Sequence, residues 1–224
     1  MRIPMLFRFS LYGFLKNQRF APLRRLVIES MGFEGMYKAS KDYLQPILKQ
    51  TAIALPLFLA FDAEKRAAIL VGLVYFVLYF LSSLGSRHSH AIADWRGSDD
   101  NAARFMWWVN GAIFVLLIPA LWFVDWYYAA IALFVVSAIL QNFWRPVLIS
   151  RFDTQTPPEM SATVLSIEAQ SQSVALIVLA PLLGWTVDLV SGFWPVGIAG
   201  AVISVLIILT GLSLNVPEEQ EVHP

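Results

Sequence analysis

Five long stretches without a charged residue dominate the hydropathy pattern of the chain. They cover residues 67–86, 105–124, 126–144, 169–187 and 189–217. An α-helix needs about 20 consecutive apolar residues to cross hydrocarbon about 30 Å thick, where its backbone can hydrogen-bond only within the helix. Asp188 alone separates the last two stretches, and Ser191-Gly192 predicts a turn between them. The pattern therefore predicts membrane-spanning helices.

A sixth spanning helix is expected ahead of these stretches. The charge-free run 50–61 is too short to span, so the helix has to begin at Tyr43 and include Lys49. The polar connection 61–66 leads directly into the next span, so the segment before it must arrive from the other side. We therefore predict an all-α membrane protein with a six-transmembrane-helix bundle over 31–215, between a cytoplasmic arm and linker at 1–30 and a cytoplasmic tail at 216–224. The expected helices are approximately 43–61, 67–86, 105–124, 126–146, 161–187 and 193–214.

Composition supports lipid as the solvent of these helices. Apolar and aromatic residues make up 58% of the 224 residues, charged residues make up 14%, and the mean hydropathy is +0.62; soluble domains carry about 25% charged residues. The chain has no cysteine, which excludes a disulfide framework, a thiolate metal site and a cysteine nucleophile. It also has no basic tract suited to nucleic acid. The lipid bilayer is therefore the expected partner.

Lysine and arginine residues set the expected orientation, because cytoplasmic segments of membrane proteins are enriched in them. With the N-terminus inside and 43–61 spanning, only Lys65 and Arg66 fall outside. The other fourteen fall at the cytoplasmic end: Arg2, Arg8, Lys16, Arg19, Arg24, Arg25, Lys38, Lys41, Lys49, Arg87, Arg96, Arg104, Arg145 and Arg151. Both termini are therefore expected in the cytoplasm, and the chain is expected to be integral to the membrane.

Tryptophan residues lie near the ends of the charge-free stretches. Their rings have an apolar body and a polar N–H group, and they favour the headgroup level of a membrane. The expected positions are the cytoplasmic interface for Trp107, Trp108 and Trp144, and the outer interface for Trp122, Trp126, Trp185 and Trp194.

Three ionisable residues are expected at membrane depth, where a charge costs about 2.5–3.5 kcal/mol. Lys49, Arg145 and Glu168 each lie about 9–10 Å inward from the expected cytoplasmic edge, at 1.5 Å per helical residue. Glu168 opposite Arg145 or Lys49 would form a neutral group, extended by Asn142 and Gln172 one turn away. These five residues are the predicted substrate or coupling-ion pathway. The alternative is a static ion pair, or Lys49 and Arg145 reaching the headgroups.

Other polar residues carry weaker signals. Asn110 is interpreted as an interhelical hydrogen-bonding residue. His88, His90 and Asp94 have the spacing of a loose metal motif, but a solvated loop explains them better, so neither a metal nor a cofactor is expected. No nucleotide-binding or hydrolase motif occurs. The chain is therefore not expected to be an enzyme, and any transport has to use a gradient.

Three segments resemble the major facilitator superfamily of transporters. Residues 93–97, Ala-Asp-Trp-Arg-Gly, resemble its G-x-x-x-D-R-x-G-R-R loop, with Asp94 and Gly97 in place and His90 and Trp95 departing from the pattern. Residues 145–188 resemble the tenth and eleventh helices of bacterial members, and 38–49 resemble the entry to the seventh. Residues 31–215 therefore resemble the C-terminal six-helix half, and the segment before 20 resembles the start of the N-terminal half, which implies an internal deletion near Phe20.

The resemblance implies a secondary transporter that moves a small solute by alternating access between two six-helix halves. Asp94, Arg96 and Gly97 would form its gating loop. A half-size chain would need to dimerise, and the expected location is the bacterial plasma membrane. Two alternatives remain: a non-transporting remnant or partner of another membrane protein, and, disfavoured by the missing motifs, a membrane-embedded enzyme.

Overall fold

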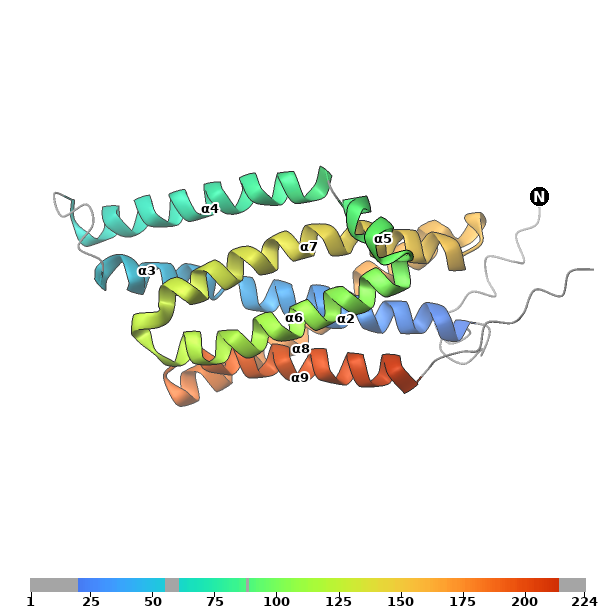
Figure 1. Cartoon of the computed structure of the whole chain (residues 1–224). Helices are drawn as coiled ribbons and strands as arrows, with labels where there is room; N and C mark the ends of the chain where they lie inside the picture. The colour runs from blue at the N-terminus through green and yellow to red at the C-terminus, as the bar shows by residue number, and fades with distance from the viewer. Residues whose placement is uncertain (1–19, 55–60, 88, 214–224) are drawn as a thin grey trace, which may run out of the picture.

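The computed structural model describes residues 20–54, 61–87 and 89–213, and its described part is all-α without a strand (Figure 1). Two short 3₁₀ turns, η3 Val124–Trp126 and η4 Pro158–Met160, accompany the helices. The helices are α2 Ala21–Lys41, α3 Leu44–Ala54, α4 Ala63–Arg87, α5 Ser89–Arg96, α6 Asp99–Trp122, α7 Tyr127–Gln155, α8 Ser161–Val190 and α9 Trp194–Ser213.

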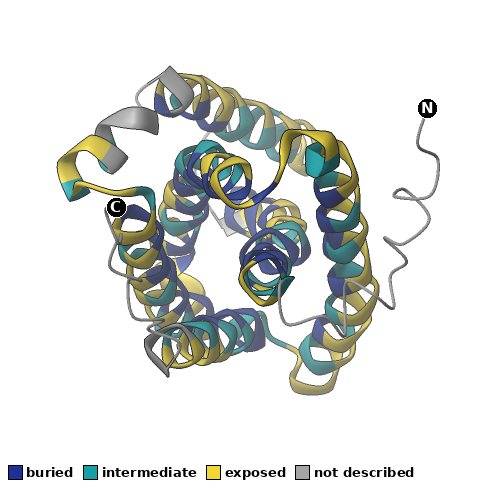
Figure 2. Ribbon diagram, turned by 90° about the vertical axis from the view of Figure 1, so that its right-hand side faces the viewer, coloured by how far each residue is buried: buried dark blue, intermediate teal, exposed yellow. Residues whose placement is uncertain are grey.

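The long helices lie side by side and reverse direction at each connection (Figure 1). The start of α2, the end of α9 and the α7–α8 connection lie at one end of the bundle, here called the terminal end. The connections from α6 to α7 and from α8 to α9 lie at the opposite end, here called the distal end. Seen along the bundle, buried residues face inward and exposed residues face outward (Figure 2).

Local polar groups define several helix ends. Asp62 precedes α4 and accepts hydrogen bonds from the backbone N–H of Lys65, at 2.9 Å, and from its ammonium group, at 3.1 Å. These two bonds hold the pKa of Asp62 below its usual value, because they favour the charged carboxylate. Ser98 caps α6 by accepting from the backbone N–H of Asn101. Ser191, with φ of 50°, ends α8 in the left-handed region, as the predicted turn requires.

Helix α2 is the central helix of the bundle and is the largest departure from the expected boundaries. The structure places a helix over Ala21–Lys41, and the helix α3, Leu44–Ala54, in the described part of the expected 43–61 span. Residues 55–60 of that span lie outside the described residues. Of the residues of α2, only Ala21, Pro22, Ile28 and Lys41 are exposed, because α2 packs against α7, α8 and α9. A helix surrounded by protein does not need a continuous apolar surface, so hydropathy alone does not reveal it.

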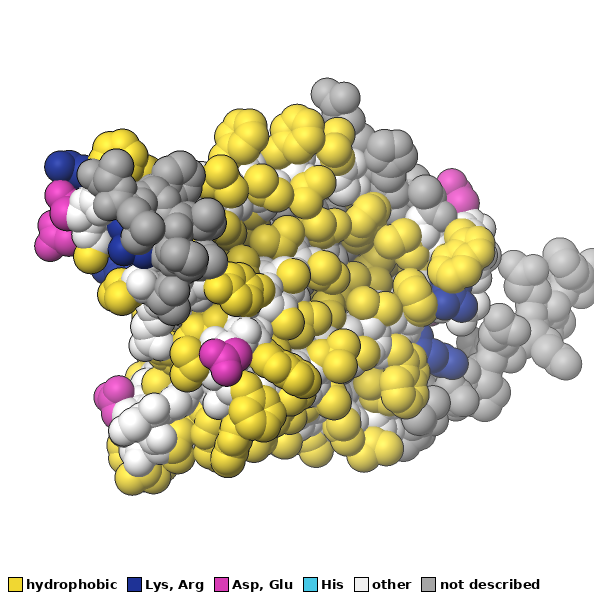
Figure 3. Space-filling view, turned by 60° about the vertical axis from the view of Figure 1, so that its left-hand side comes forward, with side chains coloured by type: hydrophobic (Ala, Val, Ile, Leu, Met, Phe, Trp, Pro, Cys, Tyr) yellow, Lys and Arg dark blue, Asp and Glu magenta, His cyan; other side chains and the backbone are white. Residues whose placement is uncertain are grey.

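Four helical segments are long and apolar enough to cross a membrane, and the described residues hold no further segment that meets these limits. They are Ala63–Gly85, Asp99–Trp122, Val124–Gln155 and Pro158–Val190; Trp194–Thr210 is apolar but shorter. Large apolar side chains face outward from them: Phe76 on α4 is 70% exposed and Ile177 on α8 is 71% exposed. On the face shown in Figure 3, hydrophobic side chains fill the middle and lysine and arginine gather toward the two ends.

Helices α6 and α9 pack closely through small residues. A Cβ atom on Gly197 would lie 2.8 Å from the backbone nitrogen of Ile118, so this position admits only glycine without a shift of the backbone. About two turns farther along both helices, the Asn110 side-chain amide donates a buried hydrogen bond of 3.1 Å to the Ser204 hydroxyl. The expected interhelical role of Asn110 is confirmed.

Two of the tryptophans expected at the membrane interface lie in the core. Trp144 is fully buried and its ring stacks on Phe33 of α2, with centroids 4.3 Å apart. Trp107 of α6 is 3% exposed and packs edge-on against both rings. Neither ring lies at a helix end, because α6 begins at Asp99 and α7 continues to Gln155, and both rings fill the space beside α2.

The distribution of cationic residues is less one-sided than expected. The Tyr43 ring packs against Phe193, 6.1 Å between centroids, so the junction of α2 and α3 lies beside the α8–α9 turn at the distal end. Arg66 donates a 2.9 Å hydrogen bond to the carbonyl of Ala52, which places the end of α3 near the start of α4. Lys41 and Lys49 therefore lie toward the distal end with Lys65 and Arg66, and not at the terminal end.

Candidate functional site

A group of charged and polar side chains is buried where α2, α7 and α8 meet. Its most buried member is Glu168 of α8, with no exposed surface. Arg145 of α7 binds it through both guanidinium nitrogens, with Nη1 2.7 Å from Oε1 and Nη2 3.3 Å from Oε2. Ser30 and Gln172 also donate hydrogen bonds to Oε1. Both carboxylate oxygens of Glu168 thus have hydrogen-bond donors, and the pair with Arg145 is bidentate.

Helix α2 supplies three members of this group at intervals of one turn. Ser30, Glu34 and Lys38 are spaced four residues apart, and residues at this spacing share one face of a helix. Glu34 lies with its Oε1 3.7 Å from Nη1 of Arg145, and Lys38 donates a hydrogen bond to the side-chain oxygen of Gln172. We call Ser30, Glu34, Lys38, Arg145, Glu168 and Gln172 the inner polar cluster.

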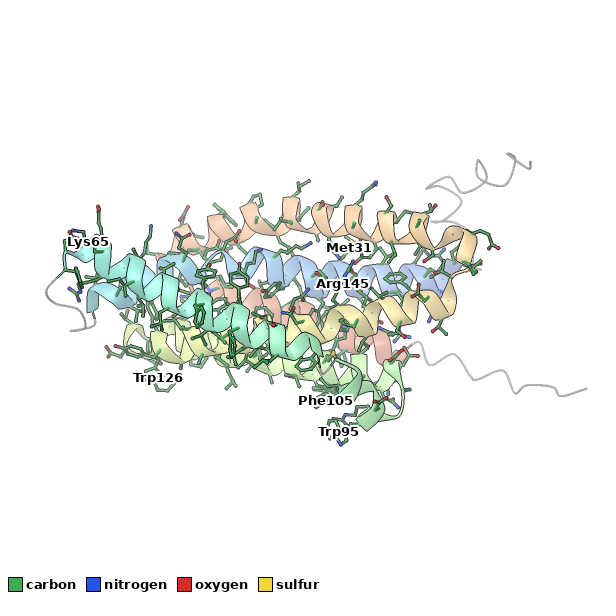
Figure 4. All side chains as sticks on the ribbon, turned by 90° about the horizontal axis from the view of Figure 1, so that it is seen from above. Met31, Lys65, Trp95, Phe105, Trp126 and Arg145 are labelled. Atoms are coloured by element: carbon green, nitrogen blue, oxygen red, sulfur yellow. The ribbon has the colours of Figure 1, made fainter. Side chains whose placement is uncertain are left out.

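The inner polar cluster is neutral as a whole and has one open side. Its two carboxylates, Glu34 and Glu168, balance the cations Lys38 and Arg145. The Arg145 side chain is 39% exposed although its partner Glu168 is fully buried. In Figure 4, Arg145 lies between the end marked by Lys65 and the end marked by Trp95, level with Met31 of α2. The cluster therefore lies inside the bundle and reaches its surface through Arg145.

A hollow of about 720 Å³ on α7 gives Arg145 its exposure. Polar side chains from successive turns of α7 contribute to its wall, including Asn142, Ser150 and Asp153. The hollow runs from Arg145 toward the C-terminal end of α7. Small polar molecules and water can therefore approach Arg145 from the terminal end of the bundle.

The structure brings together three of the five residues predicted for the pathway, Arg145, Glu168 and Gln172. Asn142 lines the hollow and donates a 2.7 Å hydrogen bond to the carbonyl of Ala138 in its own helix. Lys49 does not belong to this group: it is exposed on α3. The lysine that reaches the cluster is Lys38, on the preceding helix α2.

Sequence reasoning did not identify Ser30, Glu34 or Lys38 as site residues. Their spacing of four residues was a usable signal, since it places polar side chains along one stripe of a single helix. The signal was missed because 1–30 was interpreted as an arm and linker, which separated Ser30 from the other two.

The residues expected to form a gating loop lie away from the inner polar cluster, in and just after α5. Asp94 is exposed, and the Arg96 guanidinium lies over the rings of Trp95 and Phe105, 4.2 and 4.0 Å from their centroids. Gly97 follows with φ of 76°, which glycine adopts without strain. Arg96 therefore fixes α5 against the start of α6 through its aromatic neighbours.

The weak metal pattern falls partly outside the described residues, because His88 is not described. Within the residues searched, no group of three or more His, Cys, Asp or Glu side chains is arranged to hold a metal ion.

A second buried ionic group lies closer to the terminal end. Arg151 of α7 contacts Glu29 of α2, with Nη1 2.6 Å from Oε2, and Asp100 of α6, with Nε 2.7 Å from Oδ1. Arg25 also binds Glu29, at 3.0 Å. The side chains of Arg151 and Glu29 are each only 6% exposed, whereas that of Asp100 is 69% exposed. One arginine thus connects three helices beside the inner polar cluster.

Replacing Arg151 with methionine is expected to lower the free energy of unfolding. Breaking a buried ion pair usually costs about 3–5 kcal/mol, and we expect a loss near the lower end of this range. Glu29 would keep Arg25 but lose its buried partner. Asp100→Asn is the matched control, expected to cost about 0–1 kcal/mol because that carboxylate is exposed. Chemical unfolding of the three purified chains measures the difference. Equal losses for the two variants would contradict the buried Arg151–Glu29 pair.

Comparison with known proteins yields no match. No protein-family model matches the chain, and no curated protein or solved structure is significantly similar to it. The resemblance to the major facilitator superfamily therefore stays a sequence-based prediction.

Proposed function

We propose that this chain is an integral membrane protein and a half-size secondary transporter, which moves a small solute by alternating access as a dimer. The observation that carries the proposal is the inner polar cluster, which holds four charges inside an apolar helical bundle. Lipid-exposed helices of a membrane protein hold ionisable residues mainly where these pair with one another or line an aqueous path. The cluster does both, since its charges are paired and Arg145 borders a hollow.

Membrane insertion is supported by the surface of the bundle. Large apolar side chains are exposed along the middle of α4 and α8, where water would make them unfavourable and lipid would not. A helix of 30 residues, such as α8, is about 45 Å long, which exceeds the hydrocarbon core of about 30 Å. The helices are therefore long enough to reach the headgroup regions, where the charged ends of the bundle would lie.

Dimerisation is part of the proposal because the hollow has a wall only on α7. In a transporter with two repeats, the pathway lies at the interface between them. A second copy, related by a two-fold axis along the membrane normal, would provide the opposite wall. The resemblance to bacterial transporters favours the plasma membrane, with both termini in the cytoplasm. The same resemblance assigns the α5 region, with Asp94, Arg96 and Gly97, to gating and no catalytic role to any residue.

Solute flux in proteoliposomes tests this proposal. We expect the full chain, reconstituted from detergent, to accumulate or release at least one member of a panel of sugars, amino acids and organic ions under an imposed proton or sodium gradient. Glu168→Gln should reduce the initial rate at least tenfold, because Arg145 loses its buried partner. Glu159→Gln, an exposed carboxylate just before α8, is the matched control and should leave the rate unchanged.

Three results would contradict the proposal. Extraction of the chain from membranes by alkaline carbonate would rule out membrane insertion. Insertion without flux of any solute would favour the alternative, a non-transporting partner of another membrane protein. A strictly monomeric chain in mild detergent that still carries solute would remove dimerisation from the mechanism.

A further inference from the structure

One carboxylate oxygen of the inner polar cluster is buried without a hydrogen-bond donor. Glu34 is 4% exposed, and its Oε1 has no hydrogen-bond partner. The nearest cationic atom, Nη1 of Arg145, is 3.7 Å away, beyond hydrogen-bonding distance. A buried polar atom in this state is unfavourable unless something else satisfies it. Glu34 therefore differs from every other charged member of the cluster.

The other carboxylate of the cluster is fully satisfied. Glu168 accepts hydrogen bonds from Arg145, Ser30 and Gln172. All of these partners donate to it, and Arg145 is a residue that cannot accept a hydrogen bond. The two carboxylates share one arginine, and Glu168 holds it at the shorter distance, 2.7 Å against 3.7 Å.

A buried acceptor lies next to Glu34. The Gln141 side chain on α7 lies close enough to the Glu34 carboxyl group to interact with it, and its own Oε1 is also buried without a hydrogen-bond partner. A side-chain amide presents either its NH₂ group or its oxygen to a neighbour by turning about one bond. Gln141 can therefore donate to a charged Glu34 and accept from a protonated one.

We propose that Glu34 is a proton-binding site of this protein, with Gln141 as the residue that accommodates both protonation states. A proton from water adds to one Glu34 oxygen, forming an O–H bond that donates to Oε1 of Gln141, and no electrons are transferred. The summed charge of Glu34, Lys38, Arg145 and Glu168 changes from 0 to +1. The inference rests on the proposed function and refines it, because it assigns proton coupling to Glu34 rather than to Glu168.

The charged and titratable surroundings of Glu34 are consistent with a site that responds to pH. Arg145 from α7 and Glu168 from α8 face it, and Lys38 lies one turn away on α2. The remaining titratable residues on this side are Tyr37 of α2 and, beyond it, Tyr75 and Tyr79 of α4. Helix α9 contains no ionisable residue. The hollow at Arg145 offers solvent an approach to the edge of the cluster.

Infrared difference spectroscopy of the purified full chain tests this site directly. Spectra recorded between acidic and alkaline pH should contain a carbonyl-stretch band of a buried protonated carboxyl group. We expect the band in the wild type and in Glu168→Gln, and its loss in Glu34→Gln. Glu64→Gln, which removes an exposed carboxylate of α4, is the matched control and should keep the band. Glu34→Asp retains a carboxyl group and should shift the band, which covers the case in which Glu34→Gln does not fold.

Several outcomes would overturn the inference. They are a wild type without the band, a band that persists in Glu34→Gln, and a band unchanged in Glu34→Asp when Glu34→Gln does not fold. Loss of the band in Glu168→Gln alone would move the proton to that residue. Gln141→Leu provides a second measurement, because it removes the acceptor: the band should move to the frequency of a carboxyl group without a hydrogen bond. The spectra do not depend on flux, so the two proposals can fail separately. A band without flux supports proton binding by Glu34 and contradicts transport, whereas flux without the band supports transport and contradicts proton binding by Glu34.

Discussion

Replacing Arg145 with methionine is expected to lower the free energy of unfolding by about 3–5 kcal/mol, the usual cost of leaving one partner of a buried ion pair alone. The residue left behind is Glu168, whose side chain has no exposed surface. Ser30 and Gln172 would still donate to it, but no cation would remain in contact with it.

Removing the other partner is expected to cost less. In Glu168→Gln the residue left behind is Arg145, which is 39% exposed, borders the hollow and lies 3.7 Å from Glu34. Its charge can therefore be hydrated or compensated. The double variant Arg145→Met/Glu168→Gln should recover much of the loss of Arg145→Met, since it buries no unpaired charge. The two single variants are expected to differ in stability because the residue left behind is fully buried in one case, Glu168, and 39% exposed in the other, Arg145.

Chemical unfolding of the two single variants and the double variant gives this coupling energy as a double-mutant cycle. Arg104→Met is the matched control, because Arg104 is exposed on α6 and its replacement is expected to change stability by less than about 0.5 kcal/mol. Additive losses within about 0.5 kcal/mol would show that Arg145 and Glu168 do not interact in the folded chain. If the two single variants lose equal free energy of unfolding, Arg145 is not more exposed to solvent than Glu168, as the structure has it.

The sequence predicted the outward-facing helices of this fold better than its centre. The expected spans 67–86, 105–124, 126–146, 161–187 and 193–214 overlap α4, α6, α7, α8 and α9. These helices each present an apolar surface outward, and a long charge-free run is the direct consequence of that surface. The Asn110–Ser204 hydrogen bond was also accessible from the sequence, because a lone amide among apolar residues requires a partner on another helix.

The central helix was not accessible in the same way. In α2, the residues Glu29, Ser30, Glu34 and Lys38 interrupt any apolar run. These side chains are tolerated because partners on α7 and α8 satisfy them, and those partners lie more than 100 residues away in sequence. Hydropathy measures the preference of each residue for lipid or water and contains no term for such a partner. Because α2 was not predicted, Lys49 was expected at the depth of Arg145 and Glu168, whereas Lys38 of α2 is the lysine beside them.

Truncating Trp144 to alanine is expected to destabilise the fold by about 3–5 kcal/mol, the range for removing a large aromatic side chain from a core. Trp144 is fully buried, and its ring stacks on Phe33 at 4.3 Å and contacts Trp107 at 5.8 Å. Phe33 and Trp144 directly precede Glu34 and Arg145 in sequence. Their stacked rings therefore hold α2 against α7 next to the ion pairs, and loss of the ring should also loosen the inner polar cluster.

Two further substitutions separate packing from a general effect of losing a tryptophan. Trp144→Phe keeps an aromatic ring against Phe33 and should cost less than Trp144→Ala. Trp108→Ala removes a ring that is 58% exposed on α6 and should cost the least of the three. Unfolding of the purified variants gives this order. Trp144→Ala should also reduce the coupling energy between Arg145 of α7 and Glu168 of α8, since α2 packs against both helices and would lose its stacking contact with the Trp144 ring. If Trp144→Ala is as stable as Trp108→Ala, α2 does not pack against α7 as described, and the inner polar cluster cannot have the stated geometry.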